Sequence, residues 1–518
     1  MNALADREVL VLGLGASGLA MARWCARAGA RVTVWDSRDD PPQAAALREH
    51  CPGVALIGGA VDEGRLRGLR WLLKSPGLAP HDPRIAALWQ GAAAAGIRTG
   101  GELDLFVLAL HELAAASAYA PQLLAITGTN GKTTTTALTA LLVERAGRSV
   151  VAAGNIGPTM LDSLARAIDE GRLPQVWVLE LSSFQLADLC ANPVVEGGFE
   201  PSAAVVLNVT QDHLDWHRTM PDYAAAKARV YGPRGTLVIN RDDPWVRAME
   251  PAPPAAKPAK GAVKAPPRPV VRYGLDAPAR PGDFGLVVEA GMAWLVRALP
   301  GEDQPRRRKG DDGDDEVHLQ RLMPADALRL RGRHNASNAL AALALASAIG
   351  CPLAPMLHGL REYRGEPHRV EFVARIGEVD AFDDTKGTNV GATVAALQGL
   401  GAERAPARIV LILGGDGKGQ DFAPLASPVA AHVRAVALIG RDAAAIRGAL
   451  QSTGVPLHDH ATLQAATRWC FEQAQPGDSV LLSPACASLD MFRDYAHRGE
   501  VFVNTVREIA AERGEVSA

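Results

Sequence analysis

Short apolar runs alternate with Ala/Leu-rich amphipathic segments along most of this chain, and this alternation restricts the fold more than any other feature. The runs are EVLVLG, RVTVWD, QLLAITG, VWVLELS, AAVVLNV, TLVIN, RIVLILGG, AVALIG and SVLLSPA. Continuous apolar strands separated by helices are typical of parallel sheets that are covered by helices on both faces. The pattern predicts an α/β fold, and several runs end in glycine- or hydroxyl-rich turns, where open α/β sheets bind their ligands.

Size and charge narrow the class of protein further. With 518 residues, the chain is long enough for about three domains. Its 54 Lys and Arg residues nearly balance its 57 Asp and Glu residues, which gives no electrostatic reason to expect nucleic acid or an anionic membrane as a partner. The six scattered cysteines form no C-x-x-C pair and favour reduced thiols in the core over a disulfide framework or a zinc site.

The N-terminus enters an apolar strand pattern without a signal-peptide pattern, and no later segment is apolar for long enough to span a bilayer. We therefore expect a cytoplasmic protein without membrane insertion, and we expect it to be a monomer.

A glycine motif, Gly13-x-Gly15-x-x-Gly18, lies between the first predicted strand and a helix, and the next strand ends at Asp36. This spacing is typical of dinucleotide-binding proteins, so an NAD-dependent oxidoreductase is one interpretation. The diphosphate of a nucleotide sugar would fit the same backbone N–H groups equally well. A tight strand-to-helix turn without any ligand is the third interpretation.

The stretch AITGTNGKTTTT contains a shortened phosphate-binding loop. Ile126 stands where the usual P-loop has its first glycine, so the loop reads Thr-Gly-Thr-Asn-Gly-Lys-Thr. The preceding strand and the following helix provide the right context for a triphosphate site. Lys132 would balance phosphate charge and Thr133 would reach Mg²⁺.

Polar residues at the ends of the following strands fit a metal site beside that loop. Glu180 ends one apolar strand, Asp212 and His213 follow the next, and Lys227 lies on the helix after it. Taken singly, a packed histidine and a solvated lysine are the commoner interpretations of His213 and Lys227. Their position after a phosphate-binding loop favours the functional interpretation.

One region departs from the α/β pattern. Pro251 to Pro269 is rich in Pro, Ala and Lys, and the stretch PGEDQPRRRKGDDGDDEVH pairs a basic block with an acidic one. Such blocks bury too little apolar surface to fold, so we expect surface insertions rather than a nucleic-acid arm. We expect Pro251–Pro269 to be dispensable. Between Pro251–Pro269 and the charged stretch, Phe284–Val296 shows the alternation of apolar and polar residues that is typical of a β-hairpin.

Several stretches together resemble the ATP-dependent Mur ligases, which build the peptide of bacterial cell-wall precursors. They are GTNGKTT, ELSSFQL, NVTQDHLD, GEPHRVEF, DDTKGTNVGAT, LGGDGKGQDF and LLSPACASLDMF. The shortened loop is the loop of that family, and similar features run from Leu10 to the C-terminus. The resemblance implies three domains: a Rossmann-like N-terminal domain (1–104), a P-loop ATPase-like central domain (105–364, with an insert at about 251–320) and a Rossmann-like C-terminal domain (365–518).

Within the family, these stretches imply the activity that adds D-glutamate to UDP-N-acetylmuramoyl-L-alanine through an acyl phosphate, with ATP and Mg²⁺. The chain lacks the D-N-P-R signature of diaminopimelate-adding members, and Asn130 stands where alanine-adding members carry histidine. A nucleotide-binding module that has lost catalysis is the alternative from another class. The presence of Lys132, Glu180, His213, Lys227 and Lys418 weakens that alternative.

The resemblance also implies roles for individual residues. The UDP substrate would contact Ser17, Asp36, Ser37, Arg38, Ser75 and Asn155; ATP would contact Gly128, Thr129, Asn130, Gly131, Lys132, Thr133, Thr134, Asn338, Arg369 and Asp384; D-glutamate would contact Lys386, Thr388, Lys418, Ser488 and Tyr495. Mg²⁺ would be held by Thr133, Glu180, His213 and Lys227, the last as a carbamate. The implied catalytic residues are Lys132, Glu180, His213, Lys227, Arg369 and Lys418.

Overall fold

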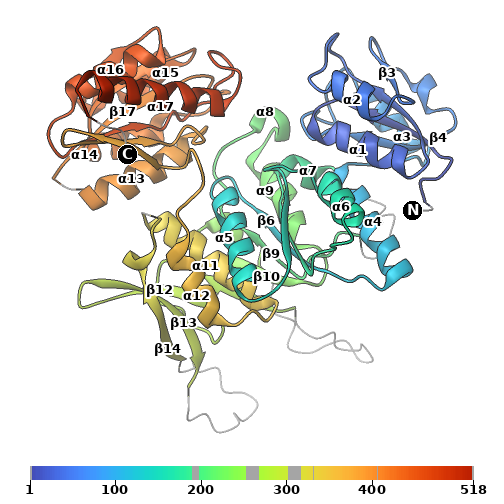
Figure 1. The fold of residues 1–518 in the computed structure, drawn as a ribbon, viewed down its shortest axis with the longest axis horizontal. Coiled ribbons are helices and arrows are strands. Elements are labelled where there is room, and N and C mark those ends of the chain that lie inside the picture. Colours follow the sequence, from blue (N-terminus) through green and yellow to red (C-terminus); the bar gives the residue numbers. More distant parts are fainter. Residues whose placement is uncertain are drawn as a thin grey trace.

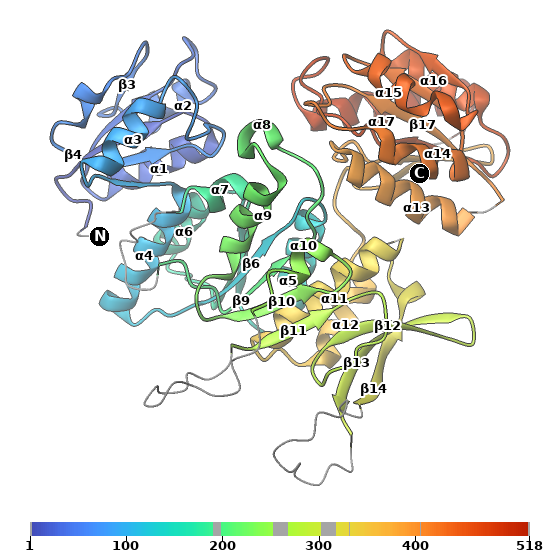
Figure 2. The ribbon, with the colours of Figure 1, turned by 180° about the vertical axis from the view of Figure 1, so that it is seen from behind.

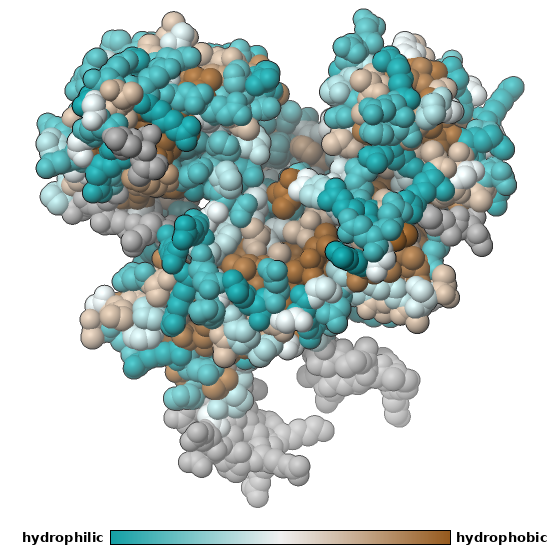
Figure 3. Space-filling view, viewed as in Figure 1, coloured by the Kyte–Doolittle hydropathy of each residue, from teal (hydrophilic) through white to brown (hydrophobic). Residues whose placement is uncertain are grey.

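The chain folds into three lobes, each built on its own sheet. The computed structural model describes residues 3–189, 198–251, 268–301, 317–330, 332–404 and 406–515. The first and last lobes stand on either side of the central lobe (Figures 1 and 2). Seen in space-filling form, the lobes bulge around a central recess in which apolar residues are visible (Figure 3).

The first lobe is a five-stranded parallel sheet in the order β3-β2-β1-β4-β5. Its strands are β1 (Glu8–Leu12), β2 (Arg31–Trp35), β3 (Ala55–Ile57), β4 (Leu69–Lys74) and β5 (Arg98–Gly100), and its helices are α1 (Ala16–Arg27), α2 (Ala44–His50) and α3 (Ala86–Ala94). The strand order reverses between β1 and β4, and open α/β sheets bind ligands at such a reversal. The predicted α/β arrangement is confirmed here.

The central lobe has a nine-stranded sheet in the order β14-β13-β12-β11-β10-β9-β6-β8-β7. Its strands are β6 (Gln122–Thr127), β7 (Val150–Gly154), β8 (Val176–Glu180), β9 (Ala203–Val206), β10 (Thr236–Asn240), β11 (Val270–Tyr273), β12 (Phe284–Glu289), β13 (Met292–Pro300) and β14 (Val317–Pro324). Its helices are α4 (Glu102–Ser117), α5 (Lys132–Arg145), α6 (Met160–Asp169), α7 (Ser183–Ala187), α8 (Leu214–His217), α9 (Met220–Ala228), α10 (Pro244–Arg247), α11 (Arg333–Ala348) and α12 (Leu353–Glu362). All pairs from β7 to β12 are parallel, whereas β12, β13 and β14 pair antiparallel.

The hairpin predicted within 284–296 is confirmed, because Val287 pairs with Trp294 in antiparallel register. The expected insertions flank this hairpin. Their residues 252–267 and 302–316 lie outside the described part of the chain, so the expectation that Pro251–Pro269 is dispensable stays a prediction.

The last lobe has a six-stranded sheet in the order β15-β16-β20-β17-β18-β19, with only β15 antiparallel to its neighbour. Its strands are β15 (Glu371–Ile376), β16 (Val379–Asp383), β17 (Ile409–Gly414), β18 (Val433–Ile439), β19 (Leu457–Asp459) and β20 (Ser479–Leu482), and its helices are α13 (Val390–Arg404), α14 (Ala426–His432), α15 (Ala443–Leu450), α16 (Leu463–Gln473) and α17 (Tyr495–Glu512).

The cores show how the lobes are joined. Trp24 of α1, Phe106 of α4 and Trp177 of β8 belong to one continuous apolar cluster, so the first lobe shares a core with the central lobe. The two apolar clusters on the faces of the last sheet contain residues of that lobe alone. Among the described residues, no helix combines the length and apolarity needed to cross a membrane. Cys25, Cys51, Cys351, Cys470 and Cys486 are free and buried, as predicted, while Cys190 lies outside the described residues.

Candidate active site

The shortened loop joins β6 to α5 in a shape that depends on its glycines. Gly131 has φ +82°, and a Cβ there would lie 2.5 Å from Asn338 Oδ1. A Cβ at Gly128 would lie 2.9 Å from the Cβ of Leu207. Because α5 begins at Lys132, the unpaired N–H groups of its first turn face the end of this loop, where an anion is stabilised.

One cavity gathers most of the residues expected to contact ATP. Asn130, Gly131 and Thr134 line it from the loop, Asn338 from α11, and Arg369 and Asp384 from the last lobe. Burial raises the pKa of Asp384 to about 7, although Ser483 Oγ donates to its Oδ2 over 2.7 Å. Arg369 Nε is buried without a hydrogen-bond partner among the described residues.

Gly128, Thr129, Lys132 and Thr133 of the loop do not line that cavity. Thr129 Oγ1 accepts a hydrogen bond from Thr210 N (3.0 Å) and lies 3.2 Å from the Tyr223 hydroxyl. Thr133 is buried in the first turn of α5. Asn130 N donates to Asn208 Oδ1 over 2.8 Å, so Asn208 holds the loop from the end of β9. Asn208 begins the stretch NVTQDHLD, but the sequence analysis assigned it no role.

Two lysines converge on the loop. Lys132 Nζ and Lys227 Nζ each donate to Gly128 O over 2.8 Å, and Lys132 also donates to Thr129 O. Lys227 is 1% exposed, and its ammonium lies 4.5 Å from the centre of the Tyr223 ring. Burial lowers the pKa of Lys227 well below its ordinary value, and the charge of Lys132 lowers it further. The structure therefore brings Lys132 and Lys227, which were predicted separately as site residues, to the same carbonyl oxygen.

Glu180 lies at the end of β8, and its two carboxylate oxygens differ in their surroundings. Its Oε1 accepts a hydrogen bond from Asn155 Nδ2 over 2.9 Å. Its Oε2 is buried and has no hydrogen-bond partner among the described residues. The charge of Glu180 raises the pKa of Lys132 against the dominant lowering by burial, so the carboxylate lies near the loop. A buried carboxylate oxygen in this state suits a cation.

His213 faces the same region from the start of α8. Its Nε2 lies 3.5 Å from Asp212 Oδ2, and its ring centre lies 4.7 Å from that of Phe184. Burial lowers the pKa of His213 to about 4; Asp212 opposes this, whereas Lys418, Lys132 and Lys227 reinforce it. The imidazole is therefore neutral at neutral pH and is able to bind a metal or accept a proton.

The last lobe contacts the loop through a residue that the sequence analysis missed. Asn389 Nδ2 donates to Asn130 Oδ1 over 3.0 Å and lies 3.4 Å from Asp212 Oδ2. Lys386 lies shortly before Asn389 in the chain. Burial lowers the pKa of Lys386, and the charges of Arg369 and Lys132 lower it further. His334 and Glu366 also line the ATP-site cavity without having been predicted.

The residues expected to hold D-glutamate all belong to the last lobe. The Lys386 ammonium is 5.6 Å from the Tyr495 ring centre, and Thr388 N donates to Lys386 O over 3.0 Å. Ser488 is buried beneath a turn in which its carbonyl accepts from Met491 and Phe492. Lys418 is exposed in the turn after β17 with φ +51°. Its charge acts on His213, so the two lobes face each other across the site.

Arg498, which the sequence analysis did not identify, makes buried hydrogen bonds to this part of the last lobe. Its guanidinium is fully buried and donates to Thr385 Oγ1 and O, to Cys486 O and to Ala487 O over 2.8–3.3 Å. These acceptors directly precede Lys386 and Ser488 in the chain. Arg498 therefore ties together the two segments that carry the predicted D-glutamate residues.

A second cavity, of about 450 Å³, lies at the strand-order reversal of the first lobe. It is lined by all five residues predicted there for the UDP substrate (Ser17, Asp36, Ser37, Arg38 and Ser75) and by the unpredicted Arg84. Asp36 Oδ2 accepts from Leu14 N (2.7 Å), and Arg38 donates to both carboxylate oxygens. Burial raises the pKa of Asp36, but these donors outweigh it and lower the pKa to about 2.

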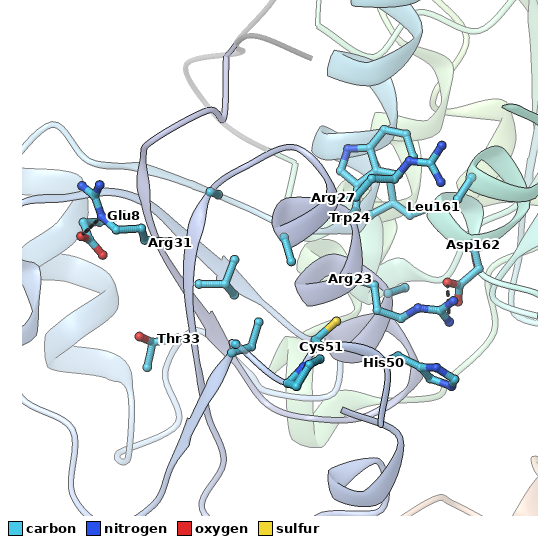
Figure 4. Close-up of a pocket in the computed structure, with 18 of the residues that line it drawn as sticks. Glu8, Arg23, Trp24, Arg27, Arg31, Thr33, His50, Cys51, Leu161 and Asp162 are labelled. Carbon is cyan, nitrogen blue, oxygen red and sulfur yellow. Dashed lines mark hydrogen bonds and ion pairs between the residues drawn. The ribbon is translucent and has the colours of Figure 1, made fainter. Parts of the chain in front are cut away.

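A further cavity of about 860 Å³ lies between the first and central lobes, and none of the predicted site residues lines it. Arg23 of α1 points toward Asp162 of α6 and pairs with it at 3.1 Å (Figure 4). Arg27 of α1 and Asp169 of α6 form a second ion pair across the same lobes at 2.6 Å. These pairs are partly exposed, so each adds little to stability.

Comparison with known proteins places this architecture in a family. Residues 7–100 match the model of the Mur ligase MurD-like N-terminal domain, residues 126–281 that of the Mur ligase middle domain, and residues 368–486 that of the Mur ligase glutamate ligase domain. The chain is 58% identical to a protein of Albidiferax ferrireducens over 99% of this chain and 98% of that protein. It is also 58% identical to one of Burkholderia mallei over 98% and 99%. The chain belongs to the Mur ligase family.

Both of these relatives are named UDP-N-acetylmuramoylalanine–D-glutamate ligase. Solved structures of other family members share the three-domain fold. The alanine ligase of Thermotoga maritima matches with a TM-score of 0.54 at 18% identity, covering 97% of this chain and 99% of that one. MurF of Acinetobacter baumannii matches with a TM-score of 0.55 at 16% identity, covering 98% and 93%. The NAD-dependent alternative left the phosphate-binding loop unexplained, whereas the match to the Mur ligase middle domain includes that loop.

Proposed function

We propose that this chain is an ATP-dependent ligase that joins D-glutamate to the alanine carboxyl group of UDP-N-acetylmuramoyl-L-alanine and releases ADP and phosphate. The names of the 58%-identical relatives support the choice of substrates. The observation that carries the proposal is the cavity shared by Asn130 and Gly131 of the loop, Asn338 of α11, and Arg369 and Asp384 of the last lobe. It joins the phosphate-binding loop to the residues proposed to contact the adenine, the γ-phosphate and the ribose of ATP.

The reaction needs activation, because a carboxylate is a poor electrophile. In our proposal, the alanine carboxylate oxygen attacks the γ-phosphorus of ATP, which forms an acyl phosphate and releases ADP. The amine of D-glutamate, having lost a proton, then attacks the acyl carbon, and phosphate leaves through a tetrahedral intermediate. Lys132 and Arg369 would stabilise the charge on the phosphoryl oxygens, and removing one such group costs on the order of 10²–10³ in rate.

The residues around the loop fit a magnesium ion in their chemistry. Glu180 offers a buried oxygen without a hydrogen-bond partner among the described residues, Thr133 a hydroxyl and His213 a neutral imidazole. When bound, Mg²⁺ would neutralise phosphate charge and polarise the phosphoryl group. The neutral His213 would also be able to accept the proton that the D-glutamate ammonium must lose.

Lys227 enters the proposal as a carbamate. An ammonium repels Mg²⁺, whereas the neutral amine attacks the carbon of CO₂, loses a proton and becomes an anionic oxygen donor. Burial and the neighbouring Lys132 lower the pKa of Lys227 and so favour the neutral amine. The contact of its Nζ with Gly128 O puts the side chain beside the loop that would hold the phosphates.

The activity is tested by measuring ADP release with UDP-N-acetylmuramoyl-L-alanine and each amino acid as acceptor. We expect release with D-glutamate and none with L-glutamate or diaminopimelate, and no release when the UDP substrate is omitted. Activity with L-glutamate or diaminopimelate in place of D-glutamate would refute the proposed acceptor. Saturable NAD(H) binding without a response to the UDP substrate would refute the proposal as a whole.

Three finer points belong to the same proposal: domain boundaries near residues 104/105 and 364/365, a monomeric state, and a cytoplasmic location. The three separate sheets support the boundaries. Sedimentation equilibrium tests the monomer, limited proteolysis tests the boundaries, and cell fractionation tests the location.

A further inference from the structure

A buried ion pair joins the first lobe to the central lobe. Lys74, the last residue of β4, is 0% exposed, and Asp188, which follows α7, is 2% exposed in the side chain. Lys74 Nζ lies 2.6 Å from Asp188 Oδ2. The rings of Trp89 and Trp216 lie 5.6 Å and 5.5 Å from the same ammonium. The two charges are thus held away from water between the lobes.

Stability alone does not explain such a pair. Removing two charges from water is costly, and replacing a buried pair by apolar side chains of similar size is often neutral or stabilising. Asp188 Oδ1 and Trp216 Nε1 are also buried without hydrogen-bond partners among the described residues. Unlike an apolar contact, the ion pair is directional, because its hydrogen bonds fix the relative positions of the atoms that they join.

On one side, the ammonium of Lys74 holds a wall of the cavity in the first lobe. Its Nζ donates to Leu78 O over 2.6 Å and lies 3.5 Å from Ser75 O. Residues 75–78 line that cavity. Ser75 Oγ in turn donates to Gly13 O over 2.9 Å. Lys74 therefore also restrains the glycine turn after β1 through Ser75.

On the other side, Asp188 is fixed to the element that borders the reaction centre. It follows α7, whose Ser183 Oγ lies 2.9 Å from His217 Nε2 and whose Phe184 packs on His213. The chain enters α7 at Ser183, three residues after Glu180 ends β8. Trp216, which covers Lys74, lies on α8 with His217. A short series of contacts therefore connects the first-lobe cavity with α7 and His213, and the chain connects α7 with Glu180.

We infer that Lys74 and Asp188 are positioning residues that set the first-lobe cavity at a fixed place relative to Glu180 and His213. This inference rests on the proposed function. A substrate anchored by its UDP group in the first lobe must present its carboxyl group to a reaction centre in the central lobe. A misplacement of about 1 Å costs on the order of 10² in rate, so a directional link between the two sites has a use that an apolar contact lacks.

The test is the double variant Lys74→Met/Asp188→Leu, which replaces the pair by apolar side chains of similar size. We expect it to fold and to bind free UDP, measured by calorimetry, within about threefold of the wild type, because the lining side chains are unchanged and the hydrogen bond from Ser75 Oγ to Gly13 O still holds that wall. Turnover of UDP-N-acetylmuramoyl-L-alanine should fall, with kcat reduced about 10- to 100-fold. The single variant Lys74→Met leaves Asp188 buried without its partner, so loss of folding there does not bear on the inference.

The matched control is Arg27→Met/Asp169→Leu, which removes the partly exposed ion pair across the same two lobes. It should keep wild-type kcat. An equal fall in the control, or wild-type kcat in a folded Lys74→Met/Asp188→Leu variant, would overturn the inference while leaving the proposed function intact. A parallel fall of UDP affinity and kcat would also overturn it, since this is the result of a damaged cavity. A wild-type chain without D-glutamate-dependent ADP release would overturn the proposed function, and the inference with it.

Discussion

Replacing Arg498 by methionine tests whether the last lobe is built around a buried guanidinium. The substitution keeps an unbranched chain of similar length and removes every donor that reaches Thr385, Cys486 and Ala487. The side chain is fully buried, so water does not replace these hydrogen bonds without opening the lobe.

The cost follows from two opposing effects. Thr385 O and Cys486 O lose their donor, at about 1–3 kcal/mol for each buried group left unsatisfied, whereas Ala487 O keeps the hydrogen bond from Asp416 N. Against this, the variant no longer buries a charge; burial lowers the pKa of Arg498 from 12.5 to about 10, which corresponds to about 3 kcal/mol at ~1.36 kcal/mol per unit. With two such groups set against this gain, we expect a net loss of about 1 kcal/mol in the free energy of unfolding of the last lobe.

The assay combines urea unfolding with steady-state kinetics. Because Lys386 and Ser488 directly follow the tethered segments, the KM for D-glutamate should rise, while binding of UDP to the first lobe stays unchanged. The matched control is Arg507→Met, which removes an exposed arginine from the same helix α17. If Arg498→Met unfolds at the same urea concentration as Arg507→Met and keeps the wild-type KM, the reasoning from buried hydrogen bonds is wrong.

Three further predictions concern charge and closure. Lys227→Ala should be nearly inactive and partly restored by a small added carboxylate, whereas Lys227→Arg should stay inactive; an active Lys227→Arg would exclude the carbamate. Burial raises the pKa of Glu102 from 4.5 to about 7, so the folded state binds the extra proton and stability falls as pH rises through that window, by up to about 3 kcal/mol. Urea unfolding at pH 5 and pH 7.5 should show a smaller fall for Glu102→Gln, and an unchanged fall would contradict the burial argument. Small-angle scattering should show compaction when ATP and the UDP substrate are both added, because Lys132 and Arg369 belong to different lobes; an unchanged radius would indicate a preformed site.

The sequence by itself determined the α/β class, the phosphate-binding loop and the glycine turn. These features are local: alternating apolar runs specify buried strands, and glycines at fixed spacing specify a backbone shape that holds wherever the turn occurs. Five of the six residues named for the UDP substrate line one cavity in the first lobe, because they follow the carboxyl ends of β1, β2 and β4. Parallel strands place such ends at one edge of the sheet. The sixth, Asn155, follows β7 in the central lobe and contacts Glu180 instead.

Only the tertiary structure decided which other residues support the site. Asn389 lies 259 residues after Asn130, and Asp188 lies 114 residues after Lys74, so no local pattern relates them. The buried position of Arg498 could not be predicted from the sequence either, because a lone arginine in an amphipathic helix is more often on the surface than buried. Side chains of this kind acquire their roles from packing between distant segments, and the energies that place them depend on burial, which a single sequence does not display.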